Sequence, residues 1–134
     1  MTIHHPTLKD GRWHELSLSE QMANVGSEVE RAISWRAKGN AVLSDKALER
    51  AMELLRFTID DPRHRKRLKE LTRLREVLTD YFRCENEYGS SDALWRGYFR
   101  FFTLRARGEV LSGRTASSLP ALPGAGKNHE PSCS

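Results

Sequence analysis

Residues 17–40, SLSEQMANVGSEVERAISWRAKGN, carry both the start and the stop signals of one amphipathic helix. Ser17 and Glu20 have the spacing of a capping box, in which a serine oxygen and a glutamate carboxylate each accept a hydrogen bond from a free backbone N–H at the helix start. Gly39 and Asn40 suit a left-handed stop, so the stretch predicts a helix over roughly residues 18–38. The apolar residues between these signals recur at helical spacing and predict its core face: Leu18, Met22, Val25, Val29, Ala32 and Ile33.

Two further helices are predicted on either side of a proline. Ser44 or Asp45 can cap the first of them, which must end near residues 60–62, DDP, because the residue before a proline avoids the α region. Its predicted core face is made of Leu48, Ala51, Met52, Leu55 and Ile59. Pro62 suits the first turn of the next helix, which the pattern extends over about six turns. The core face of that helix is predicted to contain Leu68, Leu71, Leu74, Leu78, Tyr81 and Phe82.

A fourth helix is predicted to start at Ser91 or Asp92 and to end near Gly108. Its broad apolar face contains Leu94, Trp95, Tyr98, Phe99, Phe102 and Ala106. These patterns predict an all-α fold, an antiparallel four-helix bundle with disordered termini. The expected organisation is a flexible leader (1–12), a helical-bundle domain (13–108) and a disordered tail (109–134) that contributes nothing to stability.

Composition places the chain among ordinary globular proteins. Its 134 residues suffice for one core, and 38% hydrophobic with 30% charged residues is the usual range. The two cysteines, Cys84 and Cys133, offer neither a disulfide framework nor a zinc quartet, which favours a reducing cytoplasm. No window approaches eighteen apolar residues and no Gly-rich phosphate loop occurs, so we expect a cytoplasmic protein without membrane contact or cofactor.

The runs WHELSLSEQMANVGSEVERAISWRAKGN, ALERAMELLRFTIDDPRHRKRLKELTRLREVLTDYF and NEYGSSD resemble a group of small uncharacterised bacterial proteins. The resemblance covers Trp13 to about Ala106 and is most specific in the first three helices. It implies a bacterial, cytoplasmic helical bundle and brings no activity with it. The chain departs from the group after Phe102, where TLRARGEVLSGR replaces a shorter ending.

Residues 63–76, RHRKRLKELTRLRE, are the most basic part of the chain. Several cations on one flank of a helix can follow a phosphate backbone, which makes this stretch a candidate nucleic-acid surface. Its candidate contact residues are Arg63, Arg65, Lys66, Arg67, Lys69 and Arg73. The alternative is an ordinary solvated face, on which Glu70 and Glu76 pair with these cations at three- or four-residue spacing. The excess charge of +4 is too small to decide between the two interpretations.

The catalytic and metal-binding patterns in the sequence are incomplete. Ribonucleases of the HEPN class carry an arginine followed, after a gap of four to six residues, by a histidine. Arg56 and His64 have seven residues and a predicted helix break between them. His64 is therefore expected to be solvated. Glu49 and Glu53 share a helix face, but no Glu-x-x-His pair accompanies them, so a salt-bridged surface is expected rather than a metal site.

The fourth predicted helix has a second apolar face. Gly97, Phe101 and Leu104 lie at helical spacing on the side away from the predicted core. Apolar area that one bundle cannot bury is usually covered by a partner or by a second copy. The sequence therefore favours a non-enzymatic interaction module, binding an unknown protein partner or forming a homo-oligomer, and an RNA-associated or ribonuclease-like bundle is the alternative.

Overall fold

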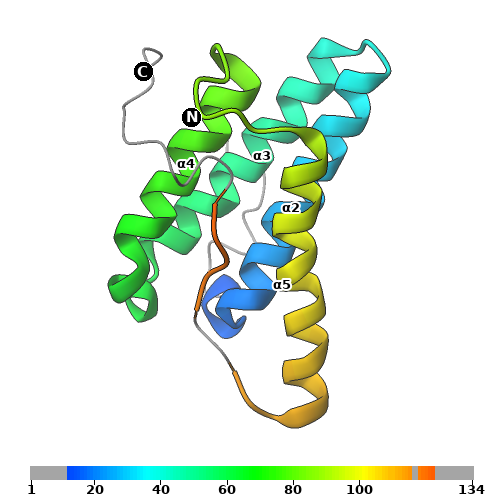
Figure 1. The fold of residues 1–134 in the computed structure, drawn as a ribbon. Coiled ribbons are helices and arrows are strands. Elements are labelled where there is room, and N and C mark those ends of the chain that lie inside the picture. Colours follow the sequence, from blue (N-terminus) through cyan, green and yellow to red (C-terminus); the bar gives the residue numbers. More distant parts are fainter. Residues whose placement is uncertain (1–11, 116–117, 123–134) are drawn as a thin grey trace.

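The computed structural model describes residues 12–115 and 118–122, and these are built from α-helices and short 3-10 helices without any strand. The elements in chain order are η1 (Arg12–Glu15), α2 (Leu18–Ala37), α3 (Ala41–Asp60), η2 (Pro62–Arg67), α4 (Leu68–Arg83) and α5 (Asp92–Ser112). In Figure 1 the chain rises through α2, returns through α3, rises again through α4 and descends through α5. The predicted all-α bundle is confirmed. None of the helices in the described ranges is both long and apolar enough to span a bilayer.

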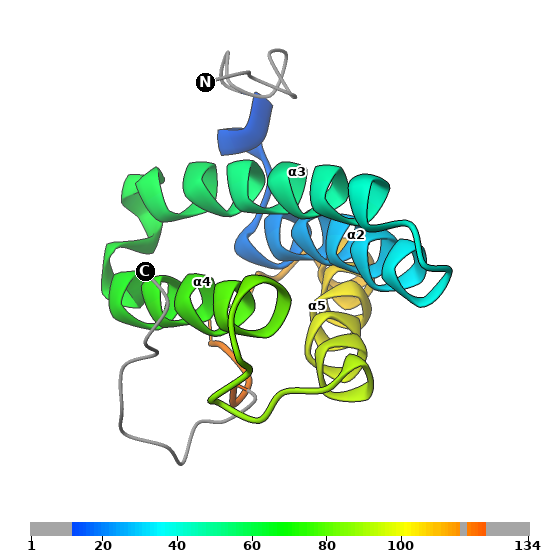
Figure 2. The ribbon, with the colours of Figure 1, turned by 90° about the horizontal axis from the view of Figure 1, so that it is seen from above.

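α2 lies at the centre of the bundle, packed against α3 on one side and α5 on another (Figure 2). Its predicted start is confirmed. The Ser17 hydroxyl accepts a hydrogen bond from the Glu20 N–H at 3.2 Å, and the Glu20 carboxylate accepts one from the Ser17 N–H at 3.0 Å. Gly39 has a left-handed φ of +78° just after the helix, as its stop signal predicted. The predicted core face is buried throughout: Leu18, Met22, Val25, Val29, Ala32 and Ile33.

The connection between α2 and α3 is shorter than predicted. Asn40, rather than Ser44 or Asp45, caps α3, and its side-chain oxygen accepts a hydrogen bond from the Leu43 N–H at 3.0 Å. Ser44 lies inside the first turn, where its buried hydroxyl donates to the Ala32 carbonyl at 2.8 Å. The hydroxyl expected to start α3 therefore ties α3 to α2 instead.

The segment after Pro62 begins as the 3-10 helix η2, and not as the α-helix that was predicted. Asp61 caps this helix by accepting a hydrogen bond from the Arg63 N–H at 3.0 Å. The backbone leaves helical geometry at His64 (φ −103°, ψ 20°), and α4 begins only at Leu68. Because of this kink Leu68 is 45% exposed, so its prediction as a core residue is wrong. The other members of the predicted face are buried or half-buried against the core: Leu71, Leu74, Leu78, Tyr81 and Phe82.

A buried carboxylate organises the connection between α4 and α5. The fully buried Asp80 accepts hydrogen bonds from the N–H groups of Glu87 at 2.9 Å and Tyr88 at 3.0 Å. Asn86, with a positive φ of 55°, exchanges two hydrogen bonds with the backbone of Ser90. These contacts satisfy the buried backbone of the loop and direct the chain into α5.

α5 continues past its predicted end at Gly108 and stops at Ser112, where Gly113 supplies a left-handed cap with φ of +69°. Glu109 lies in this extension, and its carboxylate accepts hydrogen bonds from the hydroxyls of Ser17 at 2.7 Å and Ser19 at 3.0 Å. Beyond the helix, two leucines of the expected tail pack against the core: Leu119 and Leu122. Part of the segment 109–134 therefore belongs to the bundle. Of the expected leader, residues 1–12, Arg12 begins η1, and residues 1–11 lie outside the described residues.

Candidate interaction surface on α5

The inner side of α5 fills the core with aromatic rings, as predicted. Trp95 stacks on Phe99 with ring centroids 6.0 Å apart, and Tyr98 meets Phe102 edge-on at 5.5 Å. The backbone of α2 approaches closely here, because an added Cβ at Gly26 would lie 2.6 Å from the Cβ of Phe99. The inner side of α5 is therefore fixed against α2, which determines which residues face outward.

The outer side of α5 carries a stripe of apolar and small residues at alternating three- and four-residue spacing. The outer stripe consists of Leu94, Gly97, Phe101, Leu104, Gly108 and Leu111. Leu94, Leu104 and Leu111 are 50%, 52% and 88% exposed, so the prediction of Leu94 as a core residue is wrong. Phe101 is half-buried and packs edge-on against Phe102 at 5.5 Å. The predicted interface of Gly97, Phe101 and Leu104 is thus the middle of a longer exposed stripe.

The two glycines of the outer stripe are not needed by the bundle itself. An added Cβ at Gly97 or Gly108 would meet nothing within 4 Å among the described residues, in contrast to Gly26. Both positions nevertheless lie within a helix, where glycine costs about 0.5–1 kcal/mol relative to alanine. Small residues on an exposed helix face allow a second helix to approach closely.

Arginines border the outer stripe along both edges. Arg100 and Arg107 lie on one edge, are exposed, and make no ion pair with any residue that the structure describes. On the other edge the Arg105 guanidinium lies 4.1 Å from the centroid of the Phe101 ring and donates to the Ser118 carbonyl. The stripe is therefore an apolar band inside a basic border.

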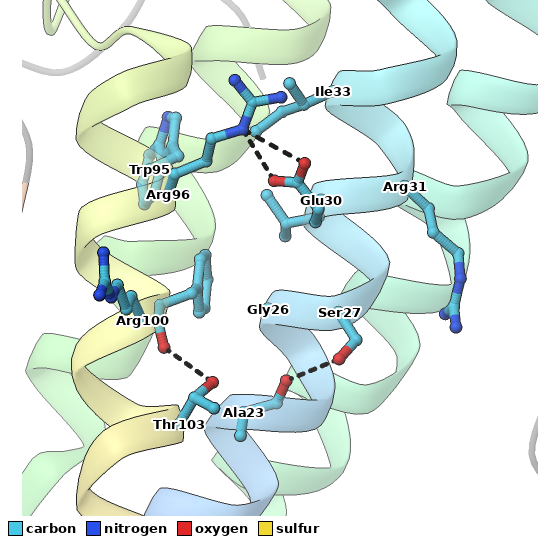
Figure 3. Close-up of a pocket in the computed structure, with 12 residues that line it drawn as sticks. Ala23, Gly26, Ser27, Glu30, Arg31, Ile33, Trp95, Arg96, Arg100 and Thr103 are labelled. Carbon is cyan, nitrogen blue, oxygen red and sulfur yellow. Dashed lines mark hydrogen bonds and ion pairs between the residues drawn. The ribbon is translucent and has the colours of Figure 1, made fainter.

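A groove of about 400 Å³ runs between α2 and α5 beside this border. Its floor is apolar and includes Gly26, Trp95 and Phe99. Figure 3 shows Arg96 reaching across to Glu30 of α2, where its Nε lies 2.9 Å from the carboxylate, while Arg100 points away from α2. The groove is thus bridged by an ion pair, and Arg100 belongs to the edge of the outer stripe rather than to that bridge.

Three of the six candidate nucleic-acid residues are engaged within the protein. Arg63 folds back on Asp61, with its Nη2 2.7 Å from the carboxylate. Arg73 donates to the Tyr88 hydroxyl at 2.8 Å, and Arg67 lies 3.6 Å from Glu70. The other three, Arg65, Lys66 and Lys69, are exposed. The first two lie in η2 and Lys69 lies in α4, with Arg67 (φ −106°, ψ 5°) between the two helices. Of the six candidate residues, three therefore have partners within the protein and three are exposed.

A polar cluster that the sequence analysis missed lies where η1, α2 and η2 meet. Gln21, fully buried, donates from its amide to the Trp13 carbonyl at 2.8 Å and to the Asp61 carboxylate at 3.0 Å. Its oxygen therefore faces the His64 Nε2 at 2.8 Å, which identifies that nitrogen as the protonated one. His64 is only 7% exposed, so the prediction of a solvated histidine is wrong. His14 approaches Asp61 from the surface at 3.3 Å.

The protonation of this cluster follows from its contacts. Burial disfavours the charged Asp61, but hydrogen bonds from Arg63 and Gln21 outweigh burial and hold the pKa of this carboxyl far below its usual value. Burial lowers the pKa of the His64 imidazole, against the attraction of the nearby Asp61 carboxylate. The stable state is thus an ionised Asp61 beside a neutral His64. An aspartate before a proline, three residues ahead of a histidine, is the sequence signal that could have revealed it.

Three acidic residues of α2 and α3 form ion pairs: Glu28, Glu30 and Asp45. Glu28 is buried and is bound by both Arg31 and Arg50, which joins α2 to α3. Among the residues that the structure describes, no three His, Cys, Asp or Glu side chains lie together as metal ligands. Neither a protein-family model, nor a curated protein, nor a solved structure matches this chain.

Proposed function

We propose that this protein is a non-enzymatic interaction module and that the outer stripe of α5 receives a helix of a macromolecular partner or of a second copy. The observation that supports this is the exposure of three leucines on one face, of which Leu104 is 52% and Leu111 is 88% exposed. A single copy of the bundle buries the other side of α5 and leaves this band in water. Contiguous exposed apolar bands of this kind are typical of interaction sites.

Site-specific photocrosslinking in cells that make the protein tests this proposal. A photoreactive amino acid at Leu104 should give a discrete crosslinked product, whereas the same group at the exposed Lys46 of α3 should not. A product with twice the chain mass would identify self-association, and a product of any other mass a different partner. Equal crosslinking at both positions, or none at either, would contradict the proposal.

Association with nucleic acid is a second candidate, supported only by the exposed Arg65, Lys66 and Lys69. Changing these three residues to Gln should weaken binding to any sequence uniformly and should flatten its salt dependence by about one charge per lost phosphate contact. An electrophoretic shift with mixed RNA and DNA over a salt series measures both effects. Absence of a shift at low salt would end this alternative.

A further inference from the structure

We infer that the helix received by α5 comes from a different protein and carries carboxylates beside its apolar residues, an inference that rests on the proposed function. The outer stripe has the same spacing read in either direction, so two copies could in principle pair antiparallel. Leu94 would then face Leu111 of the second copy, and Phe101 would face its Leu104. Apolar complementarity alone would allow a homodimer.

The charges beside the stripe oppose that homodimer. Arg100 and Arg107 occupy the flanking positions that meet across a pair of helices. In the antiparallel arrangement Arg100 of each copy faces Arg107 of the other, so both contacts bring like charges together. In a parallel arrangement Arg100 faces the second copy's Arg105, which is again a like-charge contact. Flanking charges of this kind select against one partner and in favour of another.

No acidic residue on α5 is available to neutralise this border. The helix contains two carboxylates, and both are already engaged. Asp92 accepts a hydrogen bond from the Tyr81 hydroxyl and lies 3.4 Å from Arg36, while Glu109 binds the hydroxyls of Ser17 and Ser19. Within α5 no carboxylate is therefore left to compensate the border, and we expect the compensating charge on the partner. An amphipathic helix with Glu or Asp on the flanks of its apolar stripe supplies it with the matching geometry.

The protein itself provides the probe that tests this inference. The double variant Arg100→Glu/Arg107→Glu presents the same apolar stripe with an acidic border, and both positions are exposed, so the fold should be kept. Sedimentation velocity should show wild type alone and variant alone as monomers, and a 1:1 complex when the two are mixed. The complex should weaken as added salt screens its exposed charge pairs. Each single variant, Arg100→Glu or Arg107→Glu, should instead dimerise on its own, because in the antiparallel arrangement its Glu faces the remaining Arg of the second copy at both contacts.

The control is Leu104→Lys in the wild-type partner, which should weaken the mixed complex by about tenfold or more because it places a charge in the apolar contact. A wild type that dimerises alone, and is made monomeric by Leu104→Lys, would overturn the inference while leaving the proposed function intact. A mixture of wild type and double variant that stays monomeric would overturn the inference. If, in addition, a photoreactive group at Leu104 gave no crosslink, the proposed function would be overturned as well. Binding to anionic vesicles without a mixed complex would also overturn it, in favour of a membrane surface.

Discussion

Asp61 is the residue at which the ends of η1, α2 and η2 are joined. Its buried carboxylate accepts hydrogen bonds from Gln21 and from the side chain and backbone of Arg63. Asp61→Asn should lower the free energy of unfolding by about 1–3 kcal/mol, because the buried Gln21 amide and the Arg63 N–H lose an ionised acceptor. Urea denaturation measures the loss. The exposed neighbour Asp60 is the matched control, and an equal loss for Asp60→Asn would contradict a special role for Asp61.

His64 makes stability depend on pH. Its pKa in the folded protein is lowered from the ordinary 6.5, so the unfolded state takes up a proton first as the pH falls. The contribution of neutral His64 is present above about pH 6.5 and is lost as the pH falls toward its folded pKa. Denaturation midpoints should therefore decrease between about pH 7 and pH 5, and His64→Gln should make that decrease smaller. An unchanged slope in the variant would show that other groups cause the dependence.

At the scale of the helices, the crossing of α2 and α5 depends on the absence of a side chain at Gly26. Gly26→Ala should destabilise the protein by about 2 kcal/mol, because the added methyl overlaps Phe99 and forces the helices apart. Gly97→Ala is the control within α5, since its methyl meets nothing, and helix propensity predicts a gain of up to about 1 kcal/mol. Thermal unfolding of both variants should show opposite signs. If both Gly26→Ala and Gly97→Ala lowered stability, the loss would come from replacing glycine within a helix and not from the overlap at the crossing of α2 and α5.

Local signals predicted the helices well, and their failures have a common physical cause. α2 was predicted from start to stop because the capping box of Ser17 and Glu20 and the buried face are adjacent in sequence. Leu68 and Leu94 were assigned to the core because spacing identifies a face of a helix but not whether a neighbour covers it. The Asp61 cluster was missed because Gln21 lies 40 residues before it. Contacts across such distances leave no periodic pattern in the sequence.

At the scale of the whole molecule, Glu109 connects the end of the last helix to the start of the first α-helix. Glu109→Ala should lower stability by about 1–2 kcal/mol, because it removes the acceptor of the Ser17 and Ser19 hydroxyls. This corrects the expectation that residues after Gly108 contribute nothing. Thermal unfolding of the full chain measures the effect, and Arg107→Ala, an exposed change on the same helix, should be nearly neutral. If Glu109→Ala and Arg107→Ala lowered stability equally, the loss would reflect a general sensitivity of this helix and not the two hydrogen bonds of Glu109.

The contact between Ser17 and Glu109 also bears on how the chain acquires its structure during synthesis. The Ser17 hydroxyl accepts a hydrogen bond from the Glu20 N–H in the first turn of α2. The same hydroxyl donates to the carboxylate of Glu109, which lies 92 residues further along the chain. The ribosome delivers the chain from its N-terminal end, so local pairs such as α2 and α3 can form early. The hydroxyl at the start of α2 gains its last partner only after nearly the whole of α5 has emerged. The start of α2 therefore reaches its final set of contacts only when the end of α5 is present. In nascent chains that end before residue 109, we expect proteases to cleave near the start of α2.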